Sequence, residues 1–193
     1  MSEWSTPDNQ TTHTAFDATL LREQQALRGF VRGLTGDAEQ ARDITQDVFM
    51  VAWRAAKEGA PPFIANADER SIRRWLYCVA YRRAISIQRH ERVLSVESLD
   101  RDRMPHLERL AAPDSFDERL AERDALTTAL ADLETADAAC LLLNVVQGFT
   151  AREIAAMLEI SPDAAKKRLT RAKQRLRDAY FAREQSPARE VRR

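Results

Sequence analysis

The most informative segment covers residues 150–180 and reads TAREIAAMLEISPDAAKKRLTRAKQRLRDAY. Thr150 and Glu153 have the spacing of a capping box, in which each side chain satisfies a free backbone N–H at a helix start. Ser161 precedes Pro162, and proline is tolerated at the first helical position because its missing N–H has no helical partner there. The segment therefore predicts a short helix, a tight turn and a long second helix.

The second of these helices is amphipathic and basic. Its apolar residues recur at helical spacing from Ala165 to Tyr180, and the other faces are rich in lysine and arginine. A short helix, a turn and a basic helix predict a helix-turn-helix, whose second helix lies in the major groove of DNA. A solvated helix of an ordinary bundle is the alternative, but it does not explain why caps, turn and charge coincide. The residues expected to face DNA are Lys166, Lys167, Thr170 and Arg171.

Charge is distributed unevenly along the chain. The 193 residues include 30 basic and 30 acidic side chains, so the net charge is zero. Residues 68–95 and 161–183 are nevertheless basic, whereas residues 96–138 are acidic. Such segregation is typical of a nucleic-acid-binding protein despite the neutral total.

The composition and periodicity predict an all-α protein. Only 5 glycines and 7 prolines are present, which favours long helices over many short strands. Helical spacing of apolar residues recurs in the first half, and it is lost in a stretch that turns acidic. We therefore expect two small helical domains joined by an acidic flexible linker. The expected boundaries are a disordered tail at 1–14, a domain at 15–91, the linker at 92–115, a domain at 116–183 and a tail at 184–193.

Local signals refine this organisation. Gly36 and Asp37 should end the first helix, expected from about Phe16 to Leu34, and cap the second. Ser115 to Glu118 fits another capping box, and Thr135 can cap the helix that follows. The third helix, from about Asp68 to His90, should bury one stripe of side chains and leave its tyrosines on another side. That stripe is Ile72, Trp75, Leu76, Val79 and Ile87.

Several function classes are disfavoured by the sequence. Cys78 and Cys140 lie far apart within apolar patterns, so we expect buried thiols and no metal site. No glycine-rich phosphate loop or nucleophile motif is present, which argues against an enzyme, and no cofactor is expected. The N-terminus lacks the apolar core of a signal peptide, and no apolar run is long enough for membrane insertion. We therefore expect a cytoplasmic protein.

Three segments, in this order, resemble the extracytoplasmic-function (ECF) group of the sigma-70 family of bacterial RNA polymerase sigma factors. Residues 36–53 are similar to the helix that binds the polymerase clamp, residues 74–85 to the −10 element helix, and residues 141–172 to the −35 module. The resemblance implies sigma region 2 in the first domain and sigma region 4 in the second. It implies a sigma factor that directs promoter recognition, with core RNA polymerase, promoter DNA and an anti-sigma factor as partners.

The resemblance also implies roles for individual residues. Phe49 and Trp53 lie one turn apart, so their stripe is equally consistent with a core. In the third helix, aromatic rings for stacking and cations for phosphates suit single-stranded DNA. The polymerase-binding residues implied are Asp43, Gln46, Asp47, Phe49 and Trp53. The −10 residues implied are Arg74, Tyr77, Tyr81, Arg82 and Arg89.

A few positions depart from the family's usual pattern. Arg82 and Ser86 stand where asparagine and aspartate are common, which leaves the base preference at −10 open. Arg42 replaces a frequent acid, and Glu159 replaces a frequent glycine in the helix-turn-helix turn. Some members of the group are thought to be activated by threonine phosphorylation, and Thr45 lies in the corresponding helix; an ordinary helix-surface threonine is the alternative.

Two other functions fit parts of the sequence. A sigma-like decoy that occupies an anti-sigma factor would need no basic DNA-binding faces, and known decoys carry a receiver domain, for which this chain lacks βα alternation. A free-standing helix-turn-helix regulator that binds DNA as a dimer would leave the first half of the chain unexplained. The sigma-factor interpretation accounts for both halves.

Overall fold

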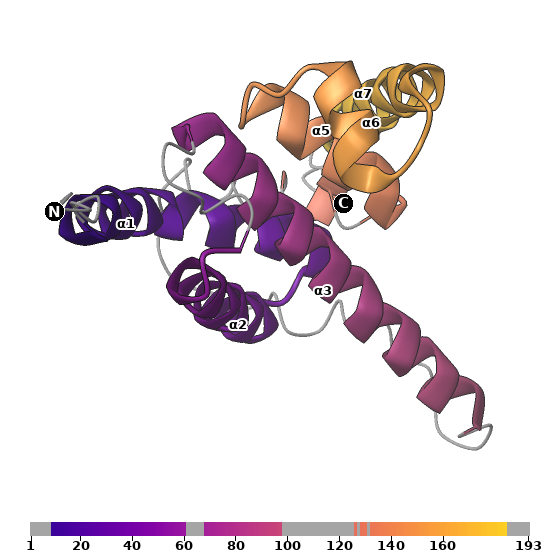
Figure 1. Cartoon of the computed structure of the whole chain (residues 1–193). Coiled ribbons are helices and arrows are strands. Elements are labelled where there is room, and N and C mark those ends of the chain that lie inside the picture. Colours follow the sequence, from indigo (N-terminus) through magenta and orange to yellow (C-terminus); the bar gives the residue numbers. More distant parts are fainter. Residues whose placement is uncertain (1–8, 61–67, 98–125, 127, 131, 185–193) are drawn as a thin grey trace, which may run out of the picture.

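The computed structural model describes residues 9–60, 68–97, 126, 128–130 and 132–184. Within these ranges the chain forms helices and no strand, which confirms the all-α prediction. Residues 98–125 of the acidic stretch, and with them the capping box predicted at Ser115, lie outside the described residues. The helices, shown in Figure 1, are α1 (Asn9–Thr35), α2 (Ala38–Lys57), α3 (Glu69–Glu97), α5 (Thr135–Val145), α6 (Ala151–Leu158) and α7 (Pro162–Glu184).

The first unit of the fold consists of α1, α2 and α3, which contact one another in all three pairs. Gly36 adopts a left-handed φ of 72°, and the Asp37 carboxylate accepts the backbone N–H of Glu39 at 2.8 Å. This glycine stop and aspartate cap are as predicted. Two boundaries differ: α1 begins at Asn9, inside the predicted disordered tail, and α3 continues to Glu97, inside the predicted linker.

The second unit consists of α5, α6 and α7, and it packs against the first. Figure 1 shows α3 crossing the molecule, with α1 and α2 on one side and the second unit on the other. Helix α6 contacts α3, and α5 contacts α1. At Gly33 a Cβ atom would stand only 2.7 Å from a methyl carbon of Leu142, so the two units approach closely there and a larger side chain would require the Leu142 side chain to move.

Helix α3 is buried differently from the prediction. Ile72 and Leu76 of the predicted stripe are buried, but Trp75, Val79 and Ile87 are only half-buried. The fully buried positions of α3 instead include Tyr77, Ala80 and Ala84. The reason is that α3 has packing partners on two sides, whereas the prediction assumed one buried stripe and an exposed remainder.

Candidate nucleic-acid and partner interfaces

The helix-turn-helix is built as its sequence predicts. Thr150 Oγ1 accepts the Glu153 N–H at 3.3 Å, and the Glu153 carboxylate accepts the Thr150 N–H at 2.8 Å, so the capping box is complete. Ser161 Oγ accepts the Ala164 N–H at 3.1 Å and caps α7. Between the helices Glu159 has a left-handed φ of 58°, a conformation that favours glycine.

Small and aliphatic residues hold the two helices together. Ile154, Ala155 and Leu158 of α6 are buried, as are Ala165, Leu169 and Ala172 of α7. The buried alanines permit a close approach of α6 and α7. The opposite face of α7 is thereby fixed outward.

That outward face carries three of the four predicted −35 residues. Lys166, Lys167 and Thr170 are exposed, and Thr170 Oγ1 donates to the Lys166 carbonyl at 3.1 Å. Arg171 differs, because its guanidinium donates to both carboxylate oxygens of Asp137, at 2.6 and 2.7 Å. In this structure Arg171 therefore joins α7 to α5.

Asp137 is the anchor that the sequence prediction missed. Its side chain is 0% exposed, and it accepts hydrogen bonds from Arg171 and, at 3.0 Å, from Arg168. Burial alone would raise the pKa of the Asp137 carboxyl, but the hydrogen bonds and positive charges of the two arginines outweigh it and lower that pKa. An acid in the first turn of an otherwise apolar helix was the available signal.

The predicted −10 residues of α3 divide into two groups. Arg74, Arg82 and Arg89 are exposed, whereas Tyr81 is half-buried. Tyr77 is 0% exposed, so the prediction that it lies on the open side of α3 is wrong for this structure. The hydroxyl of Tyr77 donates to Glu23 at 3.0 Å, and burial, together with the Glu23 charge, raises its pKa.

The ring of Tyr77 is covered from both units. It meets Phe30 of α1 edge-on at 5.2 Å between centroids and Phe149 of the second unit at 6.0 Å. Phe149 is itself fully buried, with the guanidinium groups of Arg70 and Arg73 at 5.4 and 5.7 Å from its centroid. Phe149 is thus an apolar plug between the helix-turn-helix and α3.

Polar contacts surround this plug. Arg70 donates to both carboxylate oxygens of Glu153, at 2.7 and 2.8 Å, and Arg82 forms an ion pair with Glu159. The Cys78 thiol donates to the Met157 carbonyl at 3.4 Å. The same face of α3 that was predicted to bind DNA therefore contacts α6 and its flanking turns.

Thr135 corrects another local prediction. Helix α5 begins at this residue, its N-cap is Glu134, and no side chain caps it. The Thr135 hydroxyl instead donates to Gln88 of α3 at 2.7 Å, and Gln88 donates onward to the Leu34 carbonyl at 3.0 Å. The threonine thus links the two units rather than closing its own helix.

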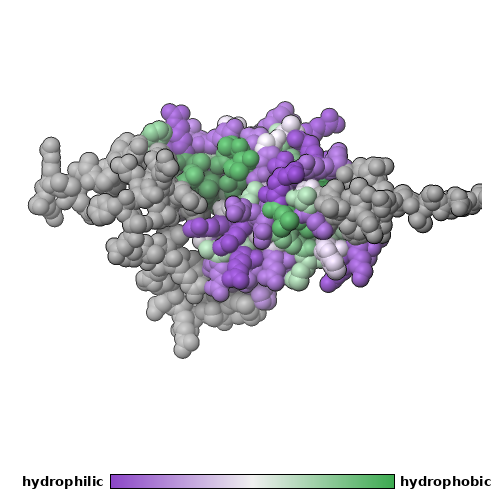
Figure 2. All heavy atoms as spheres, turned by 90° about the vertical axis from the view of Figure 1, so that its left-hand side faces the viewer, coloured by the Kyte–Doolittle hydropathy of each residue, from purple (hydrophilic) through white to green (hydrophobic). Residues whose placement is uncertain are grey.

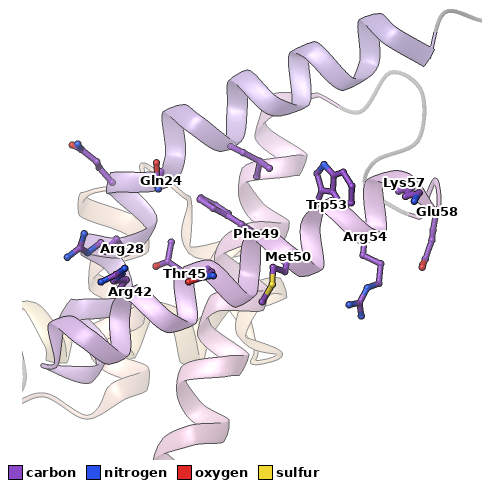
Figure 3. Close-up of a pocket in the computed structure, with 13 residues that line it drawn as sticks. Gln24, Arg28, Arg42, Thr45, Phe49, Met50, Trp53, Arg54, Lys57 and Glu58 are labelled. Carbon is purple, nitrogen blue, oxygen red and sulfur yellow. The ribbon is translucent and has the colours of Figure 1, made fainter.

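A groove of about 1190 Å³ lies along α1 and α2, and Figure 3 shows the side chains that line it. Three of the predicted polymerase-binding residues, Gln46, Phe49 and Trp53, are among them, and Trp53 is 59% exposed. Lys57 Nζ lies 5.8 Å from the Trp53 ring. Asp43 and Asp47 belong to the same helix but not to the groove lining.

Thr45 lines the inner part of this groove but is not a surface residue. Its side chain is 5% exposed, and Oγ1 donates to the Ala41 carbonyl at 2.7 Å. In this structure the hydroxyl is therefore bonded within its own helix, and Thr45 is not the exposed helix-surface threonine of the alternative.

A second, more apolar groove of about 370 Å³ lies on the second unit. Its floor is aliphatic, from Leu141, Leu142 and Val145 of α5 to Leu176 of α7, and Lys173 and Arg177 stand beside it. Seen from the left of Figure 1, the surface carries separate hydrophobic patches among hydrophilic side chains (Figure 2). Exposed apolar patches of this kind mark partner-binding surfaces.

Among the described residues no cluster of His, Cys, Asp or Glu could hold a metal ion. None of the helices in the same ranges is both long and apolar enough to span a membrane.

Comparison with known proteins agrees with the two-unit architecture. The family model for Sigma-70 region 2 matches residues 20–93, and that for Sigma-70 region 4 matches residues 123–176. Two solved structures share the fold: the sigma factor RpoE in complex with the anti-sigma factor NepR from Bartonella quintana, and CnrH in complex with the cytosolic domain of CnrY. The first has a TM-score of 0.65 and 22% identity over 86% of this chain and 96% of that chain. The second has a TM-score of 0.58 and 23% identity over 88% and 90%.

A curated relative gives a closer likeness in sequence. The ECF RNA polymerase sigma factor SigL of Mycobacterium tuberculosis is 31% identical over 169 residues, which cover 84% of this chain and 90% of that protein. The chain belongs to the ECF RNA polymerase sigma factors of the sigma-70 family.

Proposed function

We propose that this sigma factor binds core RNA polymerase through the α1–α2 groove and promoter DNA through α7 and, once it is accessible, α3. The observation that carries the proposal is the capped helix-turn-helix, which fixes Lys166, Lys167 and Thr170 on the outward face of α7. Cations and a hydroxyl at successive positions suit phosphates and base edges of the −35 element.

The groove supports the polymerase part of the proposal. Phe49 and Trp53 give it an aromatic floor that is open to solvent, and aromatic anchors of this kind are enriched at interface hot spots. Asp43 and Asp47 lie on the same helix and would pair with basic residues of the clamp. An anti-sigma factor would occupy the same accessible grooves.

The α3 part of the proposal concerns the non-template strand of the −10 element. Arg74, Arg82 and Arg89 would contact phosphates, and Tyr81 would stack on an unpaired base. Tyr77 would join them only after the second unit moves, because Phe149 covers its ring.

The experiment is reconstitution with core polymerase that lacks a sigma subunit. Transcription from genomic fragments should begin at discrete sites, and mapping them would give the promoter sequence. Trp53→Ala should weaken the complex with core, and Lys166→Ala with Lys167→Ala should reduce initiation while core binding persists. Arg22→Ala, at an exposed cation on α1 outside the groove lining, is the control. A folded protein that forms no complex with core would overturn the proposal.

A further inference from the structure

A buried carboxylate of α5 contacts the arginines of the helix proposed to bind DNA. The side chain of Asp137 is 0% exposed, and it belongs to α5, outside the helix-turn-helix. Three arginines of α7 surround it, from Arg168 through Arg171 to Arg175. A buried charge is costly unless it is paired, and the cations that pair with this one all lie on α7. The cluster therefore joins the core of the second unit to its proposed DNA-binding helix.

Arg171 makes the closest of these contacts. Its Nε and Nη2 groups donate to the two carboxylate oxygens of Asp137, at 2.6 and 2.7 Å, in the planar fork that arginine forms with carboxylates. Nη1 lies outside this fork, and the side chain as a whole is 45% exposed. The guanidinium thus has one edge fixed by α5 and another part that is open to solvent.

The open part belongs to the side of α7 that carries the exposed lysines. Residues four apart on a helix lie on the same side, so Arg171 follows the exposed Lys167 by one turn. We propose that Asp137 is a positioning residue for promoter DNA, which holds Arg171 so that the free part of its guanidinium contacts a phosphate beside the lysines. The inference rests on the proposed function of α7, and it adds a residue that acts on DNA binding without touching DNA.

The physical effect of the fork is to order Arg171 before DNA arrives. A free arginine side chain samples many rotamers, and ordering it on binding opposes association. The Asp137 carboxylate would also repel a nearby phosphate, so its two effects on affinity have opposite signs. Because its oxygens already accept N–H groups from Arg168 and Arg171, its charge is compensated locally. We therefore expect the ordering effect to prevail.

Glu134 provides a matched comparison in the same cluster. Its carboxylate lies 3.3 Å from Arg168 Nη1 and 3.6 Å from Arg171 Nη2, and its side chain is 56% exposed. Glu134→Gln removes the same charge as Asp137→Asn but leaves the fork between Asp137 and Arg171 in place. The two variants therefore separate the ordering of the arginine from simple repulsion of DNA.

The experiment measures binding of the full chain to a fluorescent, mixed-sequence DNA duplex by anisotropy at several salt concentrations. Asp137→Asn should bind about fivefold more weakly, which is the effect of ordering one long side chain on binding. Its slope of log affinity against log salt should match the wild type, because the phosphate contact is still made. Arg171→Ala should instead lower that slope by about one. Glu134→Gln should bind at least as tightly as the wild type, and tighter binding by Asp137→Asn as well would refute the positioning role.

A double-mutant cycle separates positioning from a general effect on the fold. In the Arg171→Ala background, Asp137→Asn should not change DNA affinity further, because the positioned group is absent. An equal loss in both backgrounds would mean that Asp137 acts through the fold of the second unit, and the inference would be wrong.

Arg171→Lys keeps the test informative if Asp137→Asn folds poorly. This variant changes a partly exposed side chain and retains its charge, but lysine lacks the planar fork. It should reproduce the loss of about fivefold with an unchanged salt slope. Full affinity in Arg171→Lys would contradict the inference.

Failure of the proposed function would give a different pattern. If Lys166→Ala with Lys167→Ala leaves duplex binding unchanged, α7 is not the DNA-binding helix, and the inference falls with the proposed function. If that double variant weakens binding while Asp137→Asn and Arg171→Lys do not, only the positioning role of Asp137 is overturned.

Discussion

Helices α3 and α7 are both basic, and both were predicted to face DNA, yet the structure treats them differently. Helix α7 packs along one side and leaves Lys166 and Lys167 exposed. Helix α3 packs against α1 and α2 on one side and α6 on the other, and Tyr77 is fully buried. The difference teaches that a basic amphipathic pattern identifies a surface suited to DNA, whereas packing between units decides whether that surface is available.

The largest effect is expected from Phe149→Ala, which removes the buried ring between the two units. Helix α3 would then be less covered by the second unit and, like α7, would leave its basic side exposed. Loss of a fully buried phenylalanine should lower the free energy of unfolding by about 3–5 kcal/mol. Denaturant titration measures this loss. Reaction of the half-buried Cys78 thiol with N-ethylmaleimide should also become faster, because Cys78 lies where α3 meets Met157 of the second unit. Phe181→Ala, at a ring that is 47% exposed beside Arg177, is the matched control and should cost far less. Equal losses in the two variants would contradict the role of Phe149.

A smaller effect is expected from Asp137→Asn. This variant tests the side of α7 that anchors the helix through Arg171, and it leaves the exposed lysines on the outward face unchanged. The change leaves Arg168 and Arg171 without their buried charged acceptor, and we expect a loss of about 2 kcal/mol in the free energy of unfolding.

The pH dependence of this variant provides a second check. Because the pKa of Asp137 is lowered in the folded chain, its contribution to stability is present above its ordinary pKa of 3.8. That contribution is lost as the pH falls through the lowered value. The stability difference between wild type and Asp137→Asn should therefore shrink in acid; a constant difference would argue against the ionised carboxylate as the cause.

The next prediction concerns the exposed side of α7. Lys166→Ala with Lys167→Ala should weaken binding of the isolated protein to duplex DNA uniformly across sequences. Each lost phosphate contact should also reduce the salt dependence of binding by about one unit in the slope of log affinity against log salt. Fluorescence anisotropy at several salt concentrations measures both quantities. The Arg22→Ala control on α1 should retain the wild-type slope, and a slope unchanged in the double variant would count against phosphate contacts.

The smallest effect should come from titration of Glu153 at the edge of α3. Hydrogen bonds from Arg70, and then from the Thr150 backbone, lower the pKa of Glu153 to about 2. Its contribution to docking is therefore complete above the ordinary value of 4.5 and is lost as the pH falls from about 4.5 to 2. The NMR shift of its side-chain carboxyl should report the low pKa, and Arg70→Gln should return that pKa toward 4.5. A normal pKa in the wild type would contradict the Arg70 contact.

Local features of the fold were predictable from the sequence because their causes are local. The capping box at Thr150, the serine cap at Ser161 and the glycine stop at Gly36 each depend on neighbouring residues, and all three form. Helical periodicity likewise identified the all-α class.

Features that depend on packing between units were not predictable in the same way. Thr135 has the spacing of a cap, but its hydroxyl donates a hydrogen bond to Gln88 of α3 instead. Tyr77 was placed on an open side because a period of 3.6 residues reveals one buried stripe and cannot reveal a second partner. Thr45 was read as a surface threonine, although its hydroxyl bonds within its own helix and its side chain is buried.

The position of Phe149 late in the chain has a consequence during protein synthesis. The N-terminal unit, α1 to α3, leaves the ribosome first, and domains generally fold in that order. Until Phe149 and α6 follow, Tyr77 and its arginine neighbours lack their cover. A nascent chain therefore passes through a stage in which the basic helix α3 is open to any nearby nucleic acid, including the ribosome that is making it.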